Sequence, residues 1–278
     1  MAPGSGWTVD PRALAALRLS KAADAYQSGD VAQAVVEAEE LLDDHPDHLD
    51  ALYLVGDASL RQGDAPVAEA AFSRYLALQP GSAEALAGLA AARFELADLA
   101  GTIASAAEAT AAEPGLAEAW YYTGLALERL GRPVEAREAH ARATQLAPTA
   151  YPPVGVCDDA TWQAALSAGR ALLPDVLAAW LADVPVITER FPPMTTLASM
   201  TPPLSPMVWC LYDGTPPEPG TGEDTLKPTA LRLFKGNLER VAAIEGDLPR
   251  RIAEALRHEV LDWLNLGPDE LPLRAPSG

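Results

Sequence analysis

Residues 117–148 read AEAWYYTGLALERLGRPVEAREAHARATQLAP, and this stretch decides the fold of the first half of the chain. Small and apolar residues recur on both sides of Gly131, which stands where a helix end favours a residue that tolerates positive φ. The stretch therefore predicts two helices joined by a short turn, and Pro148 closes it.

The same pattern recurs upstream with a period of 34 residues, marked by Pro46, Pro80, Pro114 and Pro148. Alignment on these prolines gives the blocks 15–48, 49–82, 83–116 and 117–150. One offset carries small residues, as expected where two helices approach closely: Ala22, Gly56, Ala90 and Gly124. Another lies twelve residues later: Ala34, Ala68, Thr102 and Ala136. The turn offset holds Gly29, Gly63 and Gly131, and Ala97 departs from it.

The period and the small-residue offsets together resemble the tetratricopeptide repeat family, and the fourth block is closest to the family pattern. The resemblance implies an all-α solenoid of four repeats, about eight helices, over residues 15–150, preceded by an N-terminal segment 1–14. Each helix pair cannot bury its apolar face alone, so the four pairs are expected to stack.

This resemblance also implies a concave groove lined by the first helix of each pair. Aromatic rings supply contact area and carboxylates attract cations, so we expect a partner protein or peptide with a basic segment. Alternatively, the acidic residues only solvate the helices, and the tyrosines pack against neighbouring helices. The expected partner-binding residues are Asp50, Tyr53, Asp57, Glu84, Phe94, Tyr121 and Glu128.

After Pro148 the 34-residue rhythm stops, and the Pro- and Gly-punctuated stretch TAYPPVGVCDD predicts a linker. A second domain is expected over residues 151–278. Asp158 or Asp159 can cap a helix through WQAALSAGRALL, and Pro174 can open another.

Three short strands are predicted by VPVITE, MVWCLYD and TALRLF, which are rich in branched and aromatic residues. A final helix is predicted from about Leu248 to Asn265, where Gly267 and Pro268 stop it. These elements make a small α+β domain.

The order of these segments resembles the minimal zincin-like metallopeptidase family of bacteria. Four segments within residues 160–271 carry the resemblance: TWQAALSAGRALLPDVLAAWLADVPVITERFPP, WCLYDG, LRLFKGNLER and LRHEVLDWLNLGPDEL. It implies a peptidase fold whose active members bind zinc through an H-E-x-x-H helix.

The zinc signature is incomplete in this chain. His258 and Glu259 stand at its first two positions, Asp262 replaces the second histidine, and Asp269 is one residue late for the family's downstream aspartate. A carboxylate in place of imidazole adds negative charge, which makes zinc-bound water less acidic. We therefore expect no cofactor and a zincin-like domain without hydrolytic activity. If the domain is active, His258, Asp262 and Asp269 hold zinc, and Glu259 is the general base.

Helical periodicity places Glu259 inside an apolar stripe formed by Leu248, Ile252, Leu256, Val260 and Trp263. A carboxylate in such a stripe is costly unless it has a partner. The partner could be a metal-bound water, Arg232, Lys235, Arg240 or a backbone donor. In the latter cases, His258 and Asp262 form an ordinary ion pair one turn apart.

The composition limits the classes of partner. A formal net charge of −19 over 278 residues argues against nucleic acids and anionic membranes, which proteins bind largely through Lys and Arg. No secretion signal or membrane-spanning run is evident, so a cytoplasmic protein is expected. Cys157 and Cys210 are expected to be reduced thiols, and His45 and His48 to have capping or solvent-facing roles.

These observations favour a protein-interaction adaptor or regulatory protein that joins a partner-binding solenoid to a zincin-like domain without hydrolytic activity, a pseudoenzyme. The alternative is an active zinc metallopeptidase whose solenoid recruits substrates.

Overall fold

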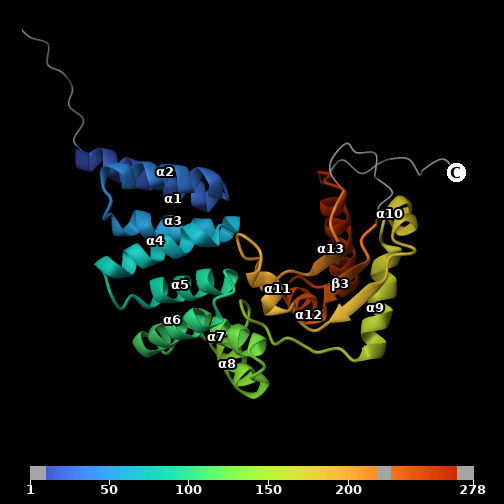
Figure 1. Cartoon of the computed structure of the whole chain (residues 1–278). Coiled ribbons are helices and arrows are strands. Elements are labelled where there is room, and N and C mark those ends of the chain that lie inside the picture. Colours follow the sequence, from blue (N-terminus) through green and yellow to red (C-terminus); the bar gives the residue numbers. More distant parts are fainter. Residues whose placement is uncertain (1–10, 218–226, 268–278) are drawn as a thin grey trace, which may run out of the picture. The chain divides into compact units, whose positions relative to one another are not determined.

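The computed structural model describes residues 11–217 and 227–267. The chain divides into two compact units, Met1–Ala147 and Pro148–Gly278 (Figure 1). Within the described ranges, no helix is both long enough and apolar enough to cross a membrane.

The first unit is a stack of helix pairs, as the 34-residue period predicts (Figure 1). The described helices are α1 (Pro11–Ser28), α2 (Val31–Asp44), α3 (Leu49–Gln62), α4 (Ala65–Leu78), α5 (Ala83–Glu95), α6 (Leu99–Ala112), α7 (Ala117–Arg129) and α8 (Pro133–Leu146). In chain order, α1, α3, α5 and α7 contact one another, so the first helices of successive pairs lie side by side.

The turns within the pairs share one backbone conformation. The φ angle is positive at each turn: 88° at Gly29, 82° at Gly63, 62° at Ala97 and 70° at Gly131. The residue after each of the first three turns caps the following helix by accepting a backbone N–H bond: Asp30, Asp64 and Asp98. Ala97 therefore makes the same turn as the glycines, at the steric cost that a Cβ has in this region.

Close packing surrounds Phe72 of α4, which is 1% exposed. A Cβ added to Gly56, at the predicted small-residue offset, would lie 2.8 Å from this ring. A Cβ added to Gly88, two residues before that offset in the third block, would lie closer still. Gly124 meets the His140 ring in the same way, at 2.5 Å. Glycine at these positions therefore lets aromatic rings lie directly on a neighbouring helix.

The second unit combines helices with a small mixed sheet (Figure 1). The strand order is β1-β3-β2, with β1 parallel and β2 antiparallel to β3, so β2 is an edge strand. The described elements are α9 (Asp159–Ala171), α10 (Asp175–Trp180), β1 (Val186–Glu189), α11 (Met194–Ala198), β2 (Cys210–Asp213), β3 (Ala230–Phe234), α12 (Lys235–Glu245) and α13 (Leu248–Trp263).

The core of the second unit lies between the sheet and helices α9 and α13. Trp162 of α9, Leu231 and Leu233 of β3, and Ile252 and Leu256 of α13 are all buried in one cluster. α13 therefore lies with its apolar stripe against the strands, which fixes the direction in which its other side chains point.

The structure differs from the sequence prediction at two places in this unit. The last helix ends at Trp263 rather than Asn265, and Asn265 takes a positive φ of 51° just after it. Helices α11 and α12 were not predicted, because α11 has only 5 residues and α12 follows β3 without a turn.

Candidate functional site

A cleft of about 780 Å³ opens between the edge strand β2 and helix α13 in the second unit. We call it the β2–α13 cleft. Most of its walls are apolar, and a few polar groups stand on α13. Its lining residues are Thr196, Met200, Leu204, Met207, Val208, Trp209, Cys210, Leu211, Tyr212, Gly214, Glu254, Ala255, Arg257, His258, Glu259, Leu261 and Asp262. This size and composition are typical of a binding site for a small molecule or a short segment.

Glu259 is the buried charge of the cleft, with 7% of the residue exposed. Its Oε1 accepts a hydrogen bond of 2.7 Å from the backbone N–H of Tyr212. Burial raises the pKa of Glu259 to about 7, the Tyr212 N–H bond opposes this shift, and the charge of Asp262 adds to it. A carboxylate in the apolar stripe of α13 requires a partner, and the partner of Glu259 is thus a backbone donor on β2. This was one of the alternatives that the sequence left open.

Glu259 accepts a hydrogen bond from the β2 backbone, as the carbonyl group of a neighbouring strand would. Because β2 is an edge strand, its outward N–H groups lack a strand partner within the sheet. The register pairs Leu211 with Arg232 of β3, and Tyr212, the next residue, directs its N–H toward Glu259. A side-chain oxygen therefore takes the place of a strand carbonyl at this point of the edge.

His258 and Asp262 also line the cleft, but both are exposed. Among the described residues these two do not form the ion pair that the sequence suggested as one option. Asp269 lies outside the described residues. No group of three His, Cys, Asp or Glu side chains within 11–217 and 227–267 comes together in a way that could hold a metal. Of the three expected zinc ligands, the described residues therefore contain two, His258 and Asp262.

Two of the three cations considered as partners of Glu259, Arg232 and Lys235, bond other groups. Arg232 of β3 bonds Asp213 of β2, with Nη2 at 2.8 Å from the carboxylate, and also bonds Glu189 of β1. This three-strand network raises the pKa of Arg232, first through its hydrogen bonds to Asp213. Lys235 donates to the carbonyl oxygen of Cys157 at 2.8 Å. The Arg232 contacts join the three strands, and the Lys235 contact fixes Cys157 in the linker. Neither cation pairs with Glu259, whose hydrogen bond is to the β2 backbone.

Asn237 of α12 positions one wall of the cleft. The residue is 0% exposed, and its Nδ2 donates to the carbonyl oxygens of Pro206, at 2.9 Å, and Val208, at 2.7 Å. This role was not expected from the sequence, because the two acceptors lie 31 and 29 residues away, in a loop that periodicity does not connect to α12.

In the first unit, a tyrosine–carboxylate cluster forms on α1, α3, α5 and α7. It consists of Tyr26, Tyr53, Asp57, Glu84 and Glu118. The Tyr26 hydroxyl donates to the Asp57 carboxylate. Burial raises the pKa of Tyr53 to about 12, and the charges of Asp57, Glu118 and Glu84 add to the shift. Three carboxylates from three repeats therefore surround one tyrosine ring.

Glu118 and Tyr26 were missed, although the repeat contains the signal for both. Glu118 occupies the same offset as Asp50 and Glu84, and Tyr26 the same offset as Phe94. Glu118 is half-buried, and burial, followed by the charge of Asp57, raises its pKa. Glu118 is therefore the carboxylate of the cluster whose charge is least stabilised by solvation.

Other expected groove residues have different surroundings. Phe94 is 0% exposed, so the expectation that it lines the groove is wrong. Its ring packs against Tyr122, with centroids 5.9 Å apart, because α5 and α7 approach closely there. Tyr121 lies against Tyr122 and the His140 ring, as in the alternative of inter-helix packing.

Two further groove candidates are placed as follows. Glu128 lies within 3.5 Å of Arg129 and within 3.4 Å of the His140 ring nitrogen. Asp50 is exposed in the first turn of α3.

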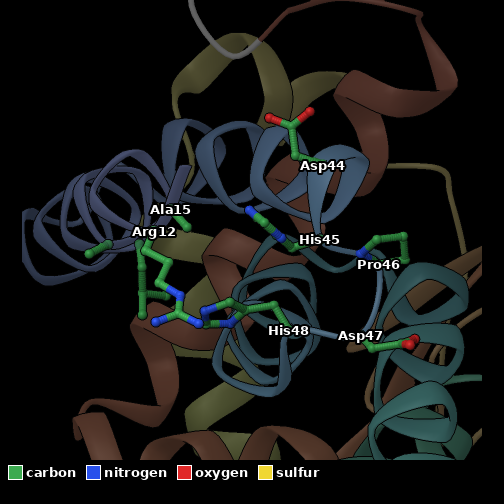
Figure 2. A pocket seen from close by; sticks show the side chains of 9 residues that line it. Arg12, Ala15, Asp44, His45, Pro46, Asp47 and His48 are labelled. Carbon is green, nitrogen blue, oxygen red and sulfur yellow. The ribbon is translucent and has the colours of Figure 1, made fainter. Parts of the chain in front are cut away.

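A second pocket, of about 700 Å³, lies between α1 and the turn that joins α2 to α3 (Figure 2). Figure 2 shows Arg12 extended toward His48. His48 caps α3, and its Nδ1 accepts the N–H of Ala51 at 3.4 Å, while His45 ends α2. The expected capping role of these histidines is confirmed.

Comparison with protein families gives two matches. A family model described as tetratricopeptide repeat matches residues 19–83 and 87–151. A family model described as zincin-like metallopeptidase matches residues 181–275, so the expected likeness over residues 160–180 is not part of the match. The comparison with curated proteins found no match.

Solved structures resemble part of the chain. MamA from Desulfovibrio magneticus RS-1 is 22% identical, with 49% of this chain and 75% of that chain covered and a TM-score of 0.44. A thermophilic TPR protein from Thermus thermophilus is 20% identical, with coverages of 48% and 74% and a TM-score of 0.44. An O-GlcNAc transferase from Thermobaculum terrenum is 23% identical, with coverages of 55% and 30% and a TM-score of 0.46. At this level of likeness, no functional property of these proteins transfers to this chain.

Proposed function

For a chain that carries tetratricopeptide repeats in its first half and a zincin-like metallopeptidase domain in its second, we propose a binding function in both halves. The repeats hold a basic segment of a partner protein on their first helices. The zincin-like domain provides a second binding surface and does not hydrolyse peptides. The protein is then an adaptor or regulatory protein.

The tyrosine–carboxylate cluster carries the first part of the proposal. Its carboxylates come from α3, α5 and α7, and one cation, Arg61, stands over the Tyr26 ring at 4.7 Å. In the described part of the chain, neither Glu84 nor Glu118 forms an ion pair. Glu84 is exposed, whereas Glu118 is half-buried, and a half-buried carboxylate without a counter-ion is stabilised by an incoming cation. A Lys- or Arg-containing segment therefore suits this surface.

The Glu259–Tyr212 contact supports the second part. One oxygen of Glu259 accepts the Tyr212 N–H at 2.7 Å, which gives this carboxylate a structural role at the edge strand that needs no metal. The aspartate at position 262 also supports it, because a carboxylate in place of the second histidine makes zinc-bound water less acidic.

A zinc metallopeptidase is the second candidate. The family match over residues 181–275 favours it, as does the pKa of about 7 at Glu259, which suits a general base at neutral pH. In that case, zinc would be held by His258 and carboxylates, and the repeats would recruit substrates.

Isosteric neutralisation of the cluster tests the binding proposal. The double variant Asp57→Asn, Glu118→Gln is expected to weaken binding of an unstructured Arg- and Lys-rich peptide about tenfold, because two partly desolvated charges are lost. The measurement is fluorescence anisotropy with the labelled peptide and the full chain, at two salt concentrations.

The matched control is Glu108→Gln, Glu138→Gln, which removes the same net charge from exposed positions on α6 and α8. It is expected to keep at least half of the natural affinity. Equal losses in the two double variants would mean that only the overall negative charge attracts the peptide, and would reject the cluster as the binding surface.

A further inference from the structure

The floor of the β2–α13 cleft carries an unusual combination of groups. Glu259 is 7% exposed, and its Oε1 accepts the N–H of Tyr212, whereas Oε2 has no hydrogen bond to a residue that the structure describes. Within the described residues, no cation forms an ion pair with it. A buried carboxylate without a counter-ion is costly, and a cation entering the cleft would relieve that cost.

The walls around this carboxylate are apolar and adaptable. Met200 is 46% exposed, and Leu204, Met207 and Leu211 are partly exposed beside it. Methionine side chains adapt to different apolar shapes, and such surfaces bind apolar segments. The occupant of the cleft should therefore combine an aliphatic body with one positive charge.

The geometry of Glu259 discriminates between the two common cationic side chains. A guanidinium prefers two parallel hydrogen bonds to both oxygens of a carboxylate, and here Tyr212 already takes one oxygen. An ammonium is a compact charge that needs only one oxygen, and its four-carbon stem can cover the apolar wall.

We propose that the β2–α13 cleft binds a lysine side chain, flanked by apolar residues, of a partner polypeptide, with the ammonium on the free oxygen of Glu259. The proposal rests on the proposed function, since a binding role for the second unit is its premise. Glu259 then binds the lysine ammonium directly, without a metal ion.

The test is calorimetric titration of the full chain with a blocked peptide that carries one lysine between leucines. The comparison peptides carry norleucine or arginine in place of the lysine. At pH 7 we expect the lysine peptide to bind about tenfold more tightly than either, because norleucine carries no charge and arginine can make only one of its two preferred hydrogen bonds to Glu259.

Two variants assign the effect to the cleft. Glu259→Gln keeps an acceptor for the Tyr212 N–H and should bind the lysine and norleucine peptides equally. Met200→Arg, at a side chain exposed in the cleft wall, should weaken the lysine peptide about tenfold, because it places a positive charge beside the site. This second substitution tests the site without touching the β2–Glu259 bond.

Other outcomes would overturn the proposal or its premise separately. Equal binding of the lysine and norleucine peptides to the natural chain, or a lysine preference that survives in Glu259→Gln, would overturn the proposal. Loss of the preference in Asp57→Asn, Glu118→Gln would move lysine binding to the repeats and leave their proposed function standing. Cleavage of the peptide would instead overturn the non-hydrolytic function.

Discussion

Glu259→Gln is expected to stabilise the second unit by about 3 kcal/mol at pH 8 and to leave its stability unchanged near pH 4. In the folded chain, burial raises the pKa of Glu259 to about 7, whereas the unfolded chain has the ordinary value of 4.5. Below the unfolded value, both states hold the proton. As the pH rises toward 7, the unfolded state loses its proton first, so the stability of the natural chain falls.

Glutamine removes this pH dependence and keeps an acceptor for the Tyr212 N–H. Each pKa unit corresponds to 1.36 kcal/mol, so a difference of about 2.5 units gives the expected effect. The measurement is urea unfolding at several pH values between 4 and 8, fitted with two transitions because the chain has two compact units.

The control for this prediction is Glu254→Gln on the same helix. Glu254 is partly exposed and lies 3.0 Å from Arg250 and 2.7 Å from Arg251, so its neutralisation should give no stabilisation that grows with pH. A gain from Glu259→Gln that is the same at pH 5 and pH 8 would show that the buried carboxylate carries no desolvation cost.

Phe72→Ala is expected to destabilise the first unit by about 4 kcal/mol. The ring is 1% exposed and fills the space left by Gly56 on α3 and Gly88 on α5, so its removal opens a cavity between three helices. The ring also meets Tyr53 edge-on, with centroids 5.7 Å apart. The variant should therefore also weaken binding of the basic peptide, because Tyr53 of the tyrosine–carboxylate cluster loses its support.

Denaturant unfolding checks the stability change, and anisotropy checks the binding change. Phe72→Leu is the graded control, with a smaller loss of stability because it retains most of the apolar volume. A change of less than about 1 kcal/mol for Phe72→Ala would contradict the role of this ring as the packing centre of the repeats.

The repeat architecture could be predicted from the sequence because its signals are local. Turn residues and small residues at the 34-residue offsets, such as Gly63 and Gly56, report on one helix pair and its neighbour. The strands were also found from local composition. The sheet order and the identity of β2 as the edge strand depend on pairing between distant segments, which periodicity does not report.

The functional sites were predicted less completely, for the same reason. Periodicity placed Glu259 in the buried stripe of α13 and required a partner, but the donor is Tyr212, 47 residues away in sequence. Phe94 was wrongly expected in the groove because side chains at the same repeat offset differ in burial. Tyr26 in the first block and Glu128 in the fourth are half-buried, whereas Phe94 in the third block is fully buried. Asp269, expected as a zinc ligand if the domain is active, lies outside the described residues and stays a prediction.

The central claim is that the β2–α13 cleft is a binding site in which Glu259 holds the edge strand and no zinc hydrolysis takes place. Elemental analysis of the full chain, purified without chelators and equilibrated with zinc, tests this claim most directly. We predict far less than one zinc per chain. About one zinc per chain, lost in His258→Ala and accompanied by peptide cleavage that Glu259→Gln abolishes, would contradict it.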